Sequence, residues 1–529
     1  MRYNTGSIIF VALIVALIIP ASCTKNFDKI NAPKAVLPES GINSATVGQA
    51  FAYAQYWGIG ARYIQVEENL HGQIFAQYYT TNVGNFSTET YGANGSWVNL
   101  FWNDFYATAA LMQLTTERIT AEEKLDLANA MAKVWRVVMY HRLTDYFGPI
   151  IYSQYGNGES TVNYDSQKDV YDNFFKTLDE AVVVLKANAG KSAFANVDQL
   201  YKGDANKWLR FANSLRLRLA MRIVYADAAK AKTEAEKAVA DGLIVANADI
   251  AGVSSTLNSP NILSKITYLV NDFRASSSIL SAMTGYNDPR LPVYFTPAAN
   301  GGTFKGLRNG LPASQRGTAV APFTSFVGPQ WISNPPRAGT LNPTRIMSAA
   351  EVAFLRAEGA LRGWNMGGTA KDFYNTGISL SLTENVTGIS PGVVTSYQNS
   401  ASLPSALSDT WNSPAMSNIP VIYDEAGNFE RRLEQIITQK WLSVYPDGYE
   451  AWAERRRTGY PRGYALITSD EPLLSKTELA RRLIFAPAEL TTNPNGHANA
   501  ISLLGGPDNM KTRLWWDKKP LSDYPTPTN

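Results

Sequence analysis

The sequence predicts a mostly α-helical protein in which tetratricopeptide-like helix pairs form a scaffold and long irregular loops connect them. Three observations predict this fold class. Apolar residues recur at helical spacing in several segments, capping patterns mark where helices begin, and stretches rich in Gly, Pro and Asn separate them. The pairs do not recur at the period of about 34 residues that defines the tetratricopeptide repeat. The prediction therefore rests on helix pairing rather than on a repeat.

Residues 1–22 have the pattern of a secretory signal peptide. Arg2 precedes an apolar run from Ile8 to Ile19, and the small residues Ala21 and Ser22 follow it. The run is shorter than the roughly 20 residues that a membrane-spanning helix needs. We therefore expect this segment to be removed during export.

Cys23, the only cysteine among 529 residues, directly follows this segment. The junction resembles a bacterial lipobox, with Pro20 where that motif usually has Leu, and it predicts a cysteine that carries acyl chains at the mature amino terminus. More than one acyl chain makes such an anchor stable. The polar residues 23–40 would form a tether between the lipid and a single body, residues 41–529. A soluble secreted protein with an incidental cysteine is the alternative.

The composition is that of a globular protein without internal disulfides. Apolar residues make up 45% of the chain, charged residues make up 18%, and the formal net charge is +3. This balance gives no case for a nucleic-acid partner, and no second apolar segment is long enough to span a membrane. The 12 Trp, 27 Tyr and 21 Phe are enough for a core and for a surface that stacks on flat, weakly charged ligands.

The first half of the body carries three helix patterns. Thr120-Ala-Glu-Glu123 matches a capping box and predicts a helix that runs from there to Gly148-Pro149. Ser166-Gln-Lys-Asp169 predicts the start of the next helix. Residues 207–222 place apolar side chains at helical spacing, with Arg218 off that stripe.

The second half continues in the same way. Ser348-Ala-Ala-Glu351 is a further capping box and predicts a helix that ends near Arg362. Two more helices are predicted, over residues 370–382 and over about 430–445. Together with the earlier helices they would complete the scaffold.

Two long segments differ from the rest of the chain. Residues 250–345 and 383–428 have few helical stripes and many Pro, Gly, Asn and Ser residues. We interpret them as loop excursions that decorate the scaffold, where binding residues tend to lie.

Several segments together identify the chain as similar to a known family. The matching stretches, in family order, are Phe27-Asp-Lys-Ile-Asn31, RLTDYFGPIIYSQ (142–154), YDSQKDVYDNFFKTLDEA (164–181), GDANKWLRFANSLRLRLAMR (203–222), NDPRLPVYF (287–295), MSAAEVAFLRAEGALRGW (347–364), QKWLSVYPDGYEAWAERRRTGYPR (439–462) and RLWWDKK (513–519). Together they resemble the SusD/RagB outer-membrane lipoproteins of Bacteroidetes, in the SusD-like nutrient-binding branch.

The resemblance implies a helical body with tetratricopeptide-like pairs and irregular loops that form a ligand face. It also implies a lipid-anchored place on the cell surface, at the outer membrane, above a SusC-like TonB-dependent transporter that the protein covers as a lid. Such a protein captures an oligosaccharide, or in some members a peptide, and performs no bond chemistry. Ligand-contacting residues vary widely in the family, so none is carried over. A surface structural or adhesion lipoprotein on the same scaffold is the alternative.

The residues form no recognisable catalytic or metal-binding motif. His71, His141 and His497 lie far apart and lack the H-E-x-x-H spacing. In the one G-x-S-x-G string, Gly388–Gly392, Pro391 follows the serine and has no N–H for an oxyanion hole. We expect no catalytic residue, no metal ligand and no cofactor. A structural Ca²⁺ stays open, as does a glycosidase pair of carboxylates, which need only be near in space.

Three consecutive arginines, Arg455–Arg457, stand near the end of one matching stretch. They could supply an anion site. We prefer the interpretation that they form ion pairs with nearby acids such as Asp447, Glu450 and Glu454, next to a packing contact of Trp452.

A neutral sugar offers C–H faces and hydroxyls, so its binder needs exposed aromatic rings beside amide, Asp or Arg side chains. Residues 78–99 have this mixture. Tyr91 and Trp97 flank a loop rich in Gly and Asn, and Asn94 and Asn99 supply donors and acceptors. On this interpretation, Trp97→Ala weakens ligand binding without a loss of thermal stability. The alternative is that Tyr91 and Trp97 hold the loop onto the helices.

A second candidate region is residues 286–331, with Tyr286, Phe323 and Trp331. The resemblance implies binding faces drawn from an early and a mid-chain loop, which favours both regions. Other tryptophans lie in helical or family-core segments and are predicted to be packing residues: Trp208, Trp364, Trp441 and Trp452. Trp515-Trp516 is predicted to pin the C-terminal tail to the body.

Overall fold

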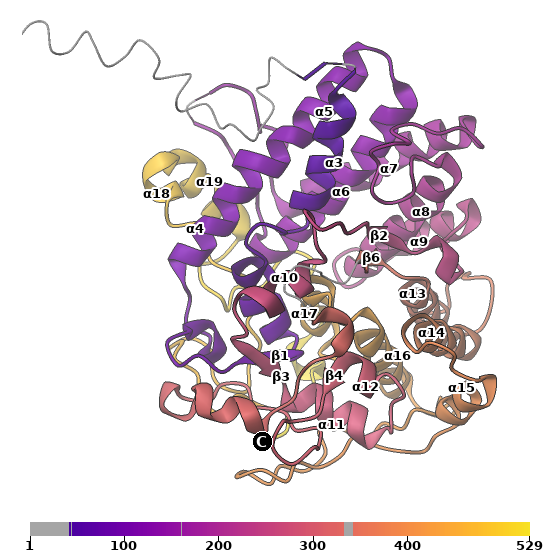
Figure 1. Ribbon diagram of the computed structural model, residues 1–529. Coiled ribbons are helices and arrows are strands. Elements are labelled where there is room, and N and C mark those ends of the chain that lie inside the picture. The colour runs from indigo at the N-terminus through magenta and orange to yellow at the C-terminus, as the bar shows by residue number, and fades with distance from the viewer. Residues whose placement is uncertain (1–41, 44, 160, 333–341) are drawn as a thin grey trace, which may run out of the picture.

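The computed structural model describes residues 42–529 apart from residues 44, 160 and 333–341. The predicted signal peptide, Cys23 and the predicted tether lie outside the described residues. The described chain is mostly helical, as predicted, and its helices pack in pairs (Figure 1). No helix in this part of the chain is long and apolar enough to cross a membrane.

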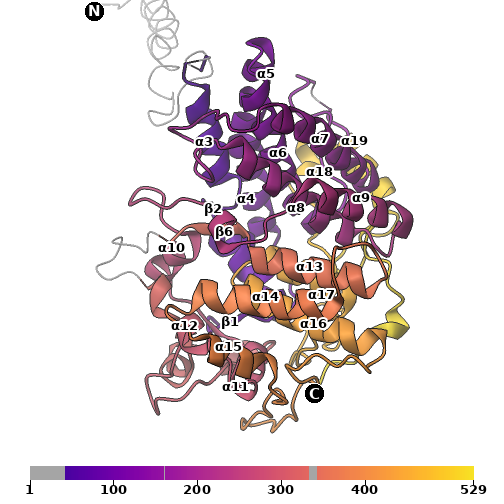
Figure 2. The same cartoon turned by 90° about the vertical axis from the view of Figure 1, so that its right-hand side faces the viewer.

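The N-terminal half forms an array in which each long helix packs against the next. These helices are α3 (Val47–Trp57), α5 (Leu111–Glu122), α6 (Asp126–Phe147), α7 (Gln167–Ala187), α8 (Ala205–Arg222) and α9 (Ala228–Asp241). They contact one another in that order, and Figures 1 and 2 show them stacked in the upper part of the molecule. The segment between α3 and α5 includes the π-helical η3 (Gln65–Gln73), α4 (Gly95–Asp104) and the π-helical η5 (Phe105–Ala110).

A second layer of helices packs below this array. α13 (Ala349–Leu361) contacts α8 and pairs with α14 (Ala370–Asn385), while α16 (Phe429–Val444) packs against both. α17 (Gly448–Thr458) then returns to η3 and α6. The short helices α18 (Glu489–Thr492) and α19 (Pro494–Leu504) follow. The C-terminal helices thus close against the N-terminal half of the chain.

The segments predicted as loop excursions contain only short elements. Residues 250–345 carry α10 (Ile262–Leu269), α11 (Ser277–Gly285) and α12 (Leu291–Tyr294), and residues 383–428 carry α15 (Pro391–Gln398). Three antiparallel strand pairs fasten these segments: β1 (Tyr79–Thr81) with β3 (Phe273–Ala275), β2 (Ala251–Val253) with β6 (Thr344–Met347), and β4 (Phe295–Thr296) with β5 (Phe326–Val327). Most of these elements lie in the lower part of Figure 1, away from α5 and α7.

The predicted start of α6 is wrong. Thr120 and Glu122 lie in the last turn of α5, and the Thr120 hydroxyl donates to the Thr116 carbonyl at 2.7 Å. α6 begins only at Asp126, after a turn in which Lys124 has a φ of +52°. A threonine hydroxyl can bond to the carbonyl four residues back as well as cap a helix, so the capping-box letters occur here at the end of a helix.

Other predicted boundaries are confirmed. The Ser166 hydroxyl accepts from the Asp169 N–H at the start of α7, and the Ser348 hydroxyl accepts from the Glu351 N–H at the start of α13, both at 3.1 Å. Gly148 ends α6 with a φ of +86°, a backbone conformation that favours glycine. The two later predicted helices are α14 and α16.

α8 is buried on nearly all sides, which its apolar stripe did not predict. Trp208 and Phe211 of the stripe are fully buried, but Arg218, which lies off the stripe, and Arg222, at its C-terminal end, are also only 2% and 1% exposed. A buried guanidinium is tolerated only when it is paired and hydrogen-bonded. The carboxylates that pair with these arginines come from helices far along the chain.

We call this group of buried charges the core ion cluster. Its cations are Arg218, Arg222, Lys440 and Arg457, and its carboxylates are Asp145, Glu351, Glu358, Glu450 and Glu454. Arg218 lies 2.7 Å from Glu351, and Arg457 lies 2.6 Å from Glu358. The cluster joins α6, α8, α13, α16 and α17, so charge pairing fixes their relative positions.

The C-terminal tail packs on α6 and α7. Trp516 is fully buried, and its indole N–H donates to the Asp145 carboxylate at 2.8 Å. The Trp515 backbone N–H donates to the Gln167 side chain at 3.0 Å. The prediction for these two tryptophans is confirmed. Trp208, Trp441 and Trp452 are buried and Trp364 packs against the core, as predicted.

Candidate functional site

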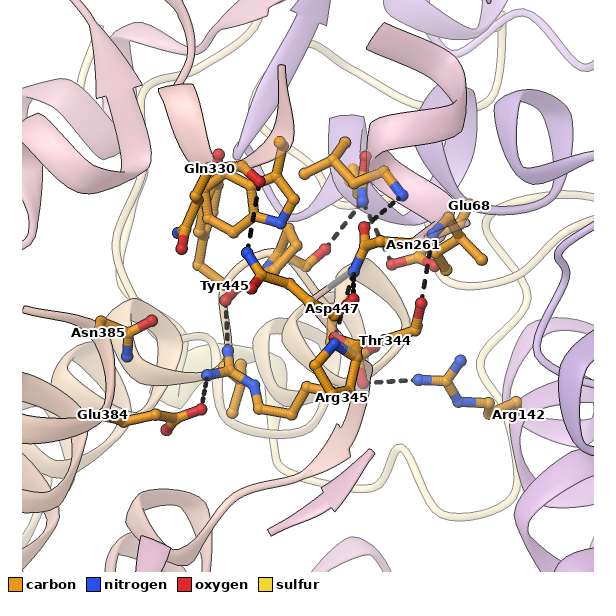
Figure 3. A pocket seen from close by; sticks show the side chains of 18 residues that line it. Glu68, Arg142, Asn261, Gln330, Thr344, Arg345, Glu384, Asn385, Tyr445 and Asp447 are labelled. Atoms are coloured by element: carbon orange, nitrogen blue, oxygen red, sulfur yellow. Dashed lines mark hydrogen bonds and ion pairs between the residues drawn. The ribbon is translucent and has the colours of Figure 1, made fainter. Parts of the chain in front are cut away.

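The candidate site is a cavity of about 240 Å³, which we call the Arg345 pocket (Figure 3). Segments far apart in the sequence form its wall: η3, α6, the start of α10, the turn η9 (Pro329–Trp331), the start of β6, the end of α14 and the loop between α16 and α17. Because α14 and α16 both end at this cavity, their terminal side chains and carbonyls face it. Most lining side chains are amides, carboxylates or guanidinium groups.

Arg345, at the start of β6, ties three parts of the wall together. Its Nη1 lies 2.8 Å from Glu384 Oε1 at the end of α14. Its Nη2 donates to the carbonyls of Ser443 and Tyr445, where α16 ends. Burial opposes the charge on Arg345, but Glu384, Tyr294 and Asp447 together more than offset this effect, so the pKa of Arg345 lies above its usual value. The guanidinium is a fixed positive centre in the pocket.

Glu68 and Arg142 lie across the pocket from Glu384 and Asn385, with Asp447 near the centre of the view (Figure 3). Arg142 Nη2 is 2.6 Å from Asp447 Oδ2. Glu68 Oε1 accepts from the Gly448 N–H at 2.7 Å. Burial and the charge of Asp447 raise the pKa of Glu68 to about 8, against the opposing effect of Arg142. The Glu68 carboxyl is therefore mostly protonated at neutral pH and can donate a hydrogen bond.

Some polar groups of the pocket have no hydrogen-bond partner within the described chain. Glu384 Oε2 is buried and lacks one. Arg142 Nε is likewise buried without a partner, and the Asn385 amide N–H donates to the Ser381 carbonyl at 2.8 Å. Unmet acceptors in a cavity are groups that a ligand hydroxyl or amide can satisfy.

The pocket suits a small, uncharged polar group. Its positive and negative side chains are already paired with one another, so neither sign of charge is in excess. Sites for drug-sized ligands usually measure about 300–1,000 Å³, and this pocket is smaller. It therefore has room for one ring or one substituent of a larger ligand.

Of the predicted ligand residues, Trp331 lines this pocket. Its ring packs against Tyr445 at 5.4 Å and Tyr294 at 6.1 Å between centroids, and its carbonyl accepts from the Thr267 hydroxyl at 2.8 Å. Only 6% of Trp331 is exposed. It forms part of the wall rather than a free stacking platform.

Tyr91 and Tyr286 are interior residues, 5% and 2% exposed. The Tyr91 ring packs edge-on against Phe75, and the Tyr286 hydroxyl donates to the Ile419 carbonyl at 2.9 Å. Neither ring offers a face to a ligand in this structure. For Tyr91 the structure thus favours the alternative interpretation, in which the residue holds its loop onto the helices.

The other early-loop residues shape α4. The Asn94 side chain caps this helix by accepting from the Trp97 N–H at 3.2 Å. Asn99 Oδ1 accepts from the Ala488 N–H at 2.9 Å and so links α4 to the C-terminal part. Trp97 is partly buried, and its ring meets Phe86 edge-on at 5.1 Å. These side chains already have structural partners.

In the described part of the chain, the loops carry two exposed aromatic side chains. Phe323 ends the turn η8 (Thr318–Phe323) and is 53% exposed. Trp411 is 39% exposed, more than any other of the 12 tryptophans, all of which lie in the described residues. Sequence reasoning missed Trp411, although an aromatic residue in a Ser/Pro/Asn-rich excursion was the available signal.

Arg308 holds the Trp411 ring in place. Its guanidinium lies 5.5 Å from the centroid of the Trp411 ring, and its Nη1 lies 2.7 Å from the Ser413 hydroxyl and 3.6 Å from Asp409. We call these four residues the Trp411 surface. Arg308 and Ser413 are themselves buried, so they hold the ring from below, and the exposed indole is the face that a sugar ring could cover.

Comparison with known proteins places the chain in a family. The family model described as SusD-like, the SusD and RagB outer membrane lipoproteins, matches residues 41–517. The chain belongs to this family. Among curated proteins no relative matches. The family consists of outer membrane lipoproteins, and this SusD-like protein has no candidate membrane-spanning helix in its described part.

Solved structures agree with this assignment. A chitin-binding SusD homolog from Flavobacterium johnsoniae is 36% identical, with a TM-score of 0.81 over 89% of this chain and 98% of that one. SusD homologs from Bacteroides thetaiotaomicron and Bacteroides uniformis are 35% and 34% identical, with TM-scores of 0.80 and 0.82. Each alignment covers 90% of this chain, and 99% and 100% of the two homologs. The predicted tetratricopeptide-like helical fold is thereby confirmed.

The SusD-like body places His71, His141 and Ser390 in structural positions. His71 and His141 are buried, and each ring nitrogen Nδ1 contacts a backbone carbonyl of its own helix. Ser390 caps α15, where its hydroxyl accepts from the Val393 N–H at 3.4 Å. Within residues 42–529, as far as they are described, no three His, Cys, Asp or Glu side chains form a group that could hold a metal ion.

The three consecutive arginines have different partners. Arg457 pairs with Glu358 and Glu454, in line with the ion-pair interpretation. Arg456 instead donates to backbone carbonyls and stacks on Trp452 at 3.7 Å from the ring centroid. Arg455 Nη1 donates to the Phe75 carbonyl at 2.7 Å. The ion-pair interpretation therefore holds for Arg457 but not for its two neighbours.

Proposed function

We propose that this SusD-like protein is a cell-surface receptor that captures an oligosaccharide, or a peptide, and delivers it to a SusC-like TonB-dependent transporter, which it covers as a lid. Membership of an outer membrane lipoprotein family supports the location. The predicted lipid on Cys23 would hold the body at the membrane. In this role the protein binds its ligand and performs no bond chemistry.

The proposed ligand class is a neutral, N-acetylated glycan related to chitin. One observation carries this proposal: the homolog described as chitin-binding is 36% identical over 89% of this chain. The Arg345 pocket is compatible with such a ligand, because its paired charges and the unmet Glu384 acceptor suit hydroxyl and amide groups better than a net charge.

Two regions of the protein would contact the ligand. In the Arg345 pocket, Asn385 Oδ1 and Glu384 Oε2 would accept hydrogen bonds from one sugar ring. On the Trp411 surface, the exposed indole would stack on the C–H face of a ring. Hydrogen bonds would give orientation and stacking would give affinity.

Calorimetric titration of the full-length protein in detergent with chitin oligosaccharides tests the ligand class. Asn385→Ala is expected to weaken binding about fivefold to tenfold, the effect of one lost hydrogen bond. Asn399→Ala is the matched control. Its side chain makes the same bond to a carbonyl four residues back, 3.0 Å away, at the end of a helix outside the pocket. Equal losses in both variants, or no glycan binding, would contradict the proposal.

Purification from outer membranes tests the lid role. A TonB-dependent barrel is expected to copurify with the lipidated protein. Recovery of the protein alone would contradict the transporter partnership. Binding only to proteins of a host cell would favour the adhesion alternative instead.

A further inference from the structure

A second cavity, of about 340 Å³, lies beneath the C-terminal tail, and we call it the tail cavity. The end of α17 and the loop after it, residues 474–481, residues 511–513 and residues 521–527 form its wall. Its charged lining residues are Arg455, Arg462, Arg481, Lys511, Arg513 and Glu478. Unlike the Arg345 pocket, this cavity has five cations and one carboxylate in its wall.

Few carboxylates serve these cations. Arg481 and Arg513 share Asp517, at 3.2 and 2.7 Å. Lys511 pairs with Glu478 at 2.9 Å. Arg462 pairs with Glu434, also at 2.9 Å. Four of the five cations therefore share three carboxylates, and Arg455 pairs with none of them.

Arg455 has no carboxylate partner among the described residues. It is 4% exposed, and its Nη1 donates to the carbonyl of Phe75. Burial lowers the pKa of Arg455 to about 10. A buried cation without an anion is unfavourable, and proteins usually pair such a group. Because Arg455 lines the tail cavity, an anion in that cavity can supply the missing partner.

We propose that the tail cavity binds a small organic carboxylate whose oxygens pair with Arg455. A guanidinium matches a carboxylate with two parallel hydrogen bonds. The remaining wall includes Leu474, Pro461, Tyr524 and Pro525, which suit the carbon skeleton that carries the carboxylate. The volume of the cavity likewise exceeds what a bare inorganic anion fills.

Two sources supply this chemistry: a hexuronate residue of a glycan, and the C-terminal carboxylate of a short peptide. The inference does not depend on the proposed function, because the tail cavity and the Arg345 pocket share no lining residue. A protein that binds neutral glycans at one site would then bind an acidic group at another.

Calorimetric titration of the full-length protein in detergent with two matched ligand pairs tests the proposal. The pairs are glucuronate with glucose, and alanyl-alanine with its C-terminal amide. We expect the carboxylate member of at least one pair to bind more tightly than its neutral counterpart. The pair that responds identifies the source. Failure of both carboxylates to bind, or equal binding of a neutral counterpart, would overturn the proposal.

Two charge-neutralising variants locate the binding. Arg455→Gln is expected to weaken carboxylate binding about tenfold or more, because a charge-assisted hydrogen bond is lost. Lys518→Gln removes the same charge from an exposed residue outside the cavity and is expected to change nothing. Equal effects of the two variants would overturn the proposal.

A third variant covers the case in which Arg455→Gln fails to fold, as judged by its melting curve. Arg462 lies at the rim with a side chain that is 36% exposed, and Arg462→Gln is expected to weaken carboxylate binding without unfolding the protein. Unchanged binding in Arg462→Gln would count against the cavity as the site. Binding of chitin oligosaccharides is expected to persist in all three variants.

Discussion

Trp411 and Trp97 show how differently two tryptophans near loops can be used. The Trp97 ring is wedged edge-on against Phe86 and His71. The Trp411 ring lies in the open with Arg308 beneath it. Burial of the Trp97 ring stabilises the fold. The exposed part of the Trp411 ring is removed from water only when a ligand covers it, so this ring can contribute to binding.

Exchanging each ring for alanine separates these roles. Trp411→Ala is expected to weaken glycan binding by about 1–2 kcal/mol, a factor of roughly 5–30, and to change the free energy of unfolding by less than about 0.5 kcal/mol. Trp97→Ala is expected to cost about 2–3 kcal/mol of stability because it removes a partly buried ring. Calorimetry and urea unfolding measure both. A stability loss for Trp411 as large as that for Trp97 would contradict the assignment.

Glu68 is a second residue whose setting has a measurable effect. Burial raises its pKa to about 8 in the folded protein, whereas an exposed glutamate titrates near 4.3. Between these two values the folded state holds a proton that the unfolded state has released. The stability contributed by Glu68 is therefore complete below about pH 4 and is lost as the pH rises toward about 8.

Glu68→Gln is expected to remove this pH dependence. Relative to the variant, the wild-type protein should lose stability on the order of a few kcal/mol between about pH 5 and pH 8. Urea unfolding of both proteins at several pH values measures the difference. A difference that stays constant over this range would show that Glu68 is ionised in the folded protein.

At the scale of elements, the core ion cluster replaces part of the apolar packing between helices. Arg222 of α8 pairs with Asp145 of α6 and with Glu450 and Glu454 of α17, and all four side chains are buried. Charges in such a place restrict geometry more than apolar side chains do, because each must keep its partner. The relative positions of these helices should therefore tolerate little change.

Removing one cation from the core ion cluster should strongly destabilise the protein. Arg222→Met leaves three carboxylates without that partner and is expected to cost about 3–5 kcal/mol of stability. Arg210→Met, on the same helix, breaks a pair with Asp249 in which the arginine side chain is 32% exposed, and is expected to cost less than about 1 kcal/mol. Urea unfolding compares them. Similar losses would mean that burial of the cluster contributes little.

At the scale of the whole molecule, the predicted lipid anchor and the folded body are separate parts of the chain. The described body has its own continuous core, and the predicted lipid on Cys23 precedes it in the chain. Loss of the lipid should therefore change where the protein resides without changing how it folds.

Cys23→Ser tests this separation. The variant is expected to leave the membrane fraction and to keep the circular dichroism spectrum and melting temperature of the wild-type body. Mass spectrometry of the wild-type amino terminus should show acyl chains on Cys23. An unmodified thiol there would rule out the anchor.

The sequence predicted most of the scaffold, because apolar spacing and the caps Ser166 and Ser348 are local signals. The prediction of a helix start failed at Thr120, because a threonine hydroxyl can either cap the start of a helix or bond to the carbonyl four residues back. The sequence could not place the Arg345 pocket, whose wall combines residues from Glu68 to Asp447. Nor could it separate buried aromatic rings such as Tyr286 from exposed ones such as Trp411, because that depends on long-range packing.

The bond from Trp516 to Asp145 spans 371 residues of sequence. An exported polypeptide emerges from its translocation channel amino terminus first, so the helix that carries Asp145 appears long before its tryptophan. The native core would then stay incomplete until the final segment has emerged. A prematurely terminated product that lacks Trp516 should be recognised by periplasmic proteases, because its unfinished interior remains accessible.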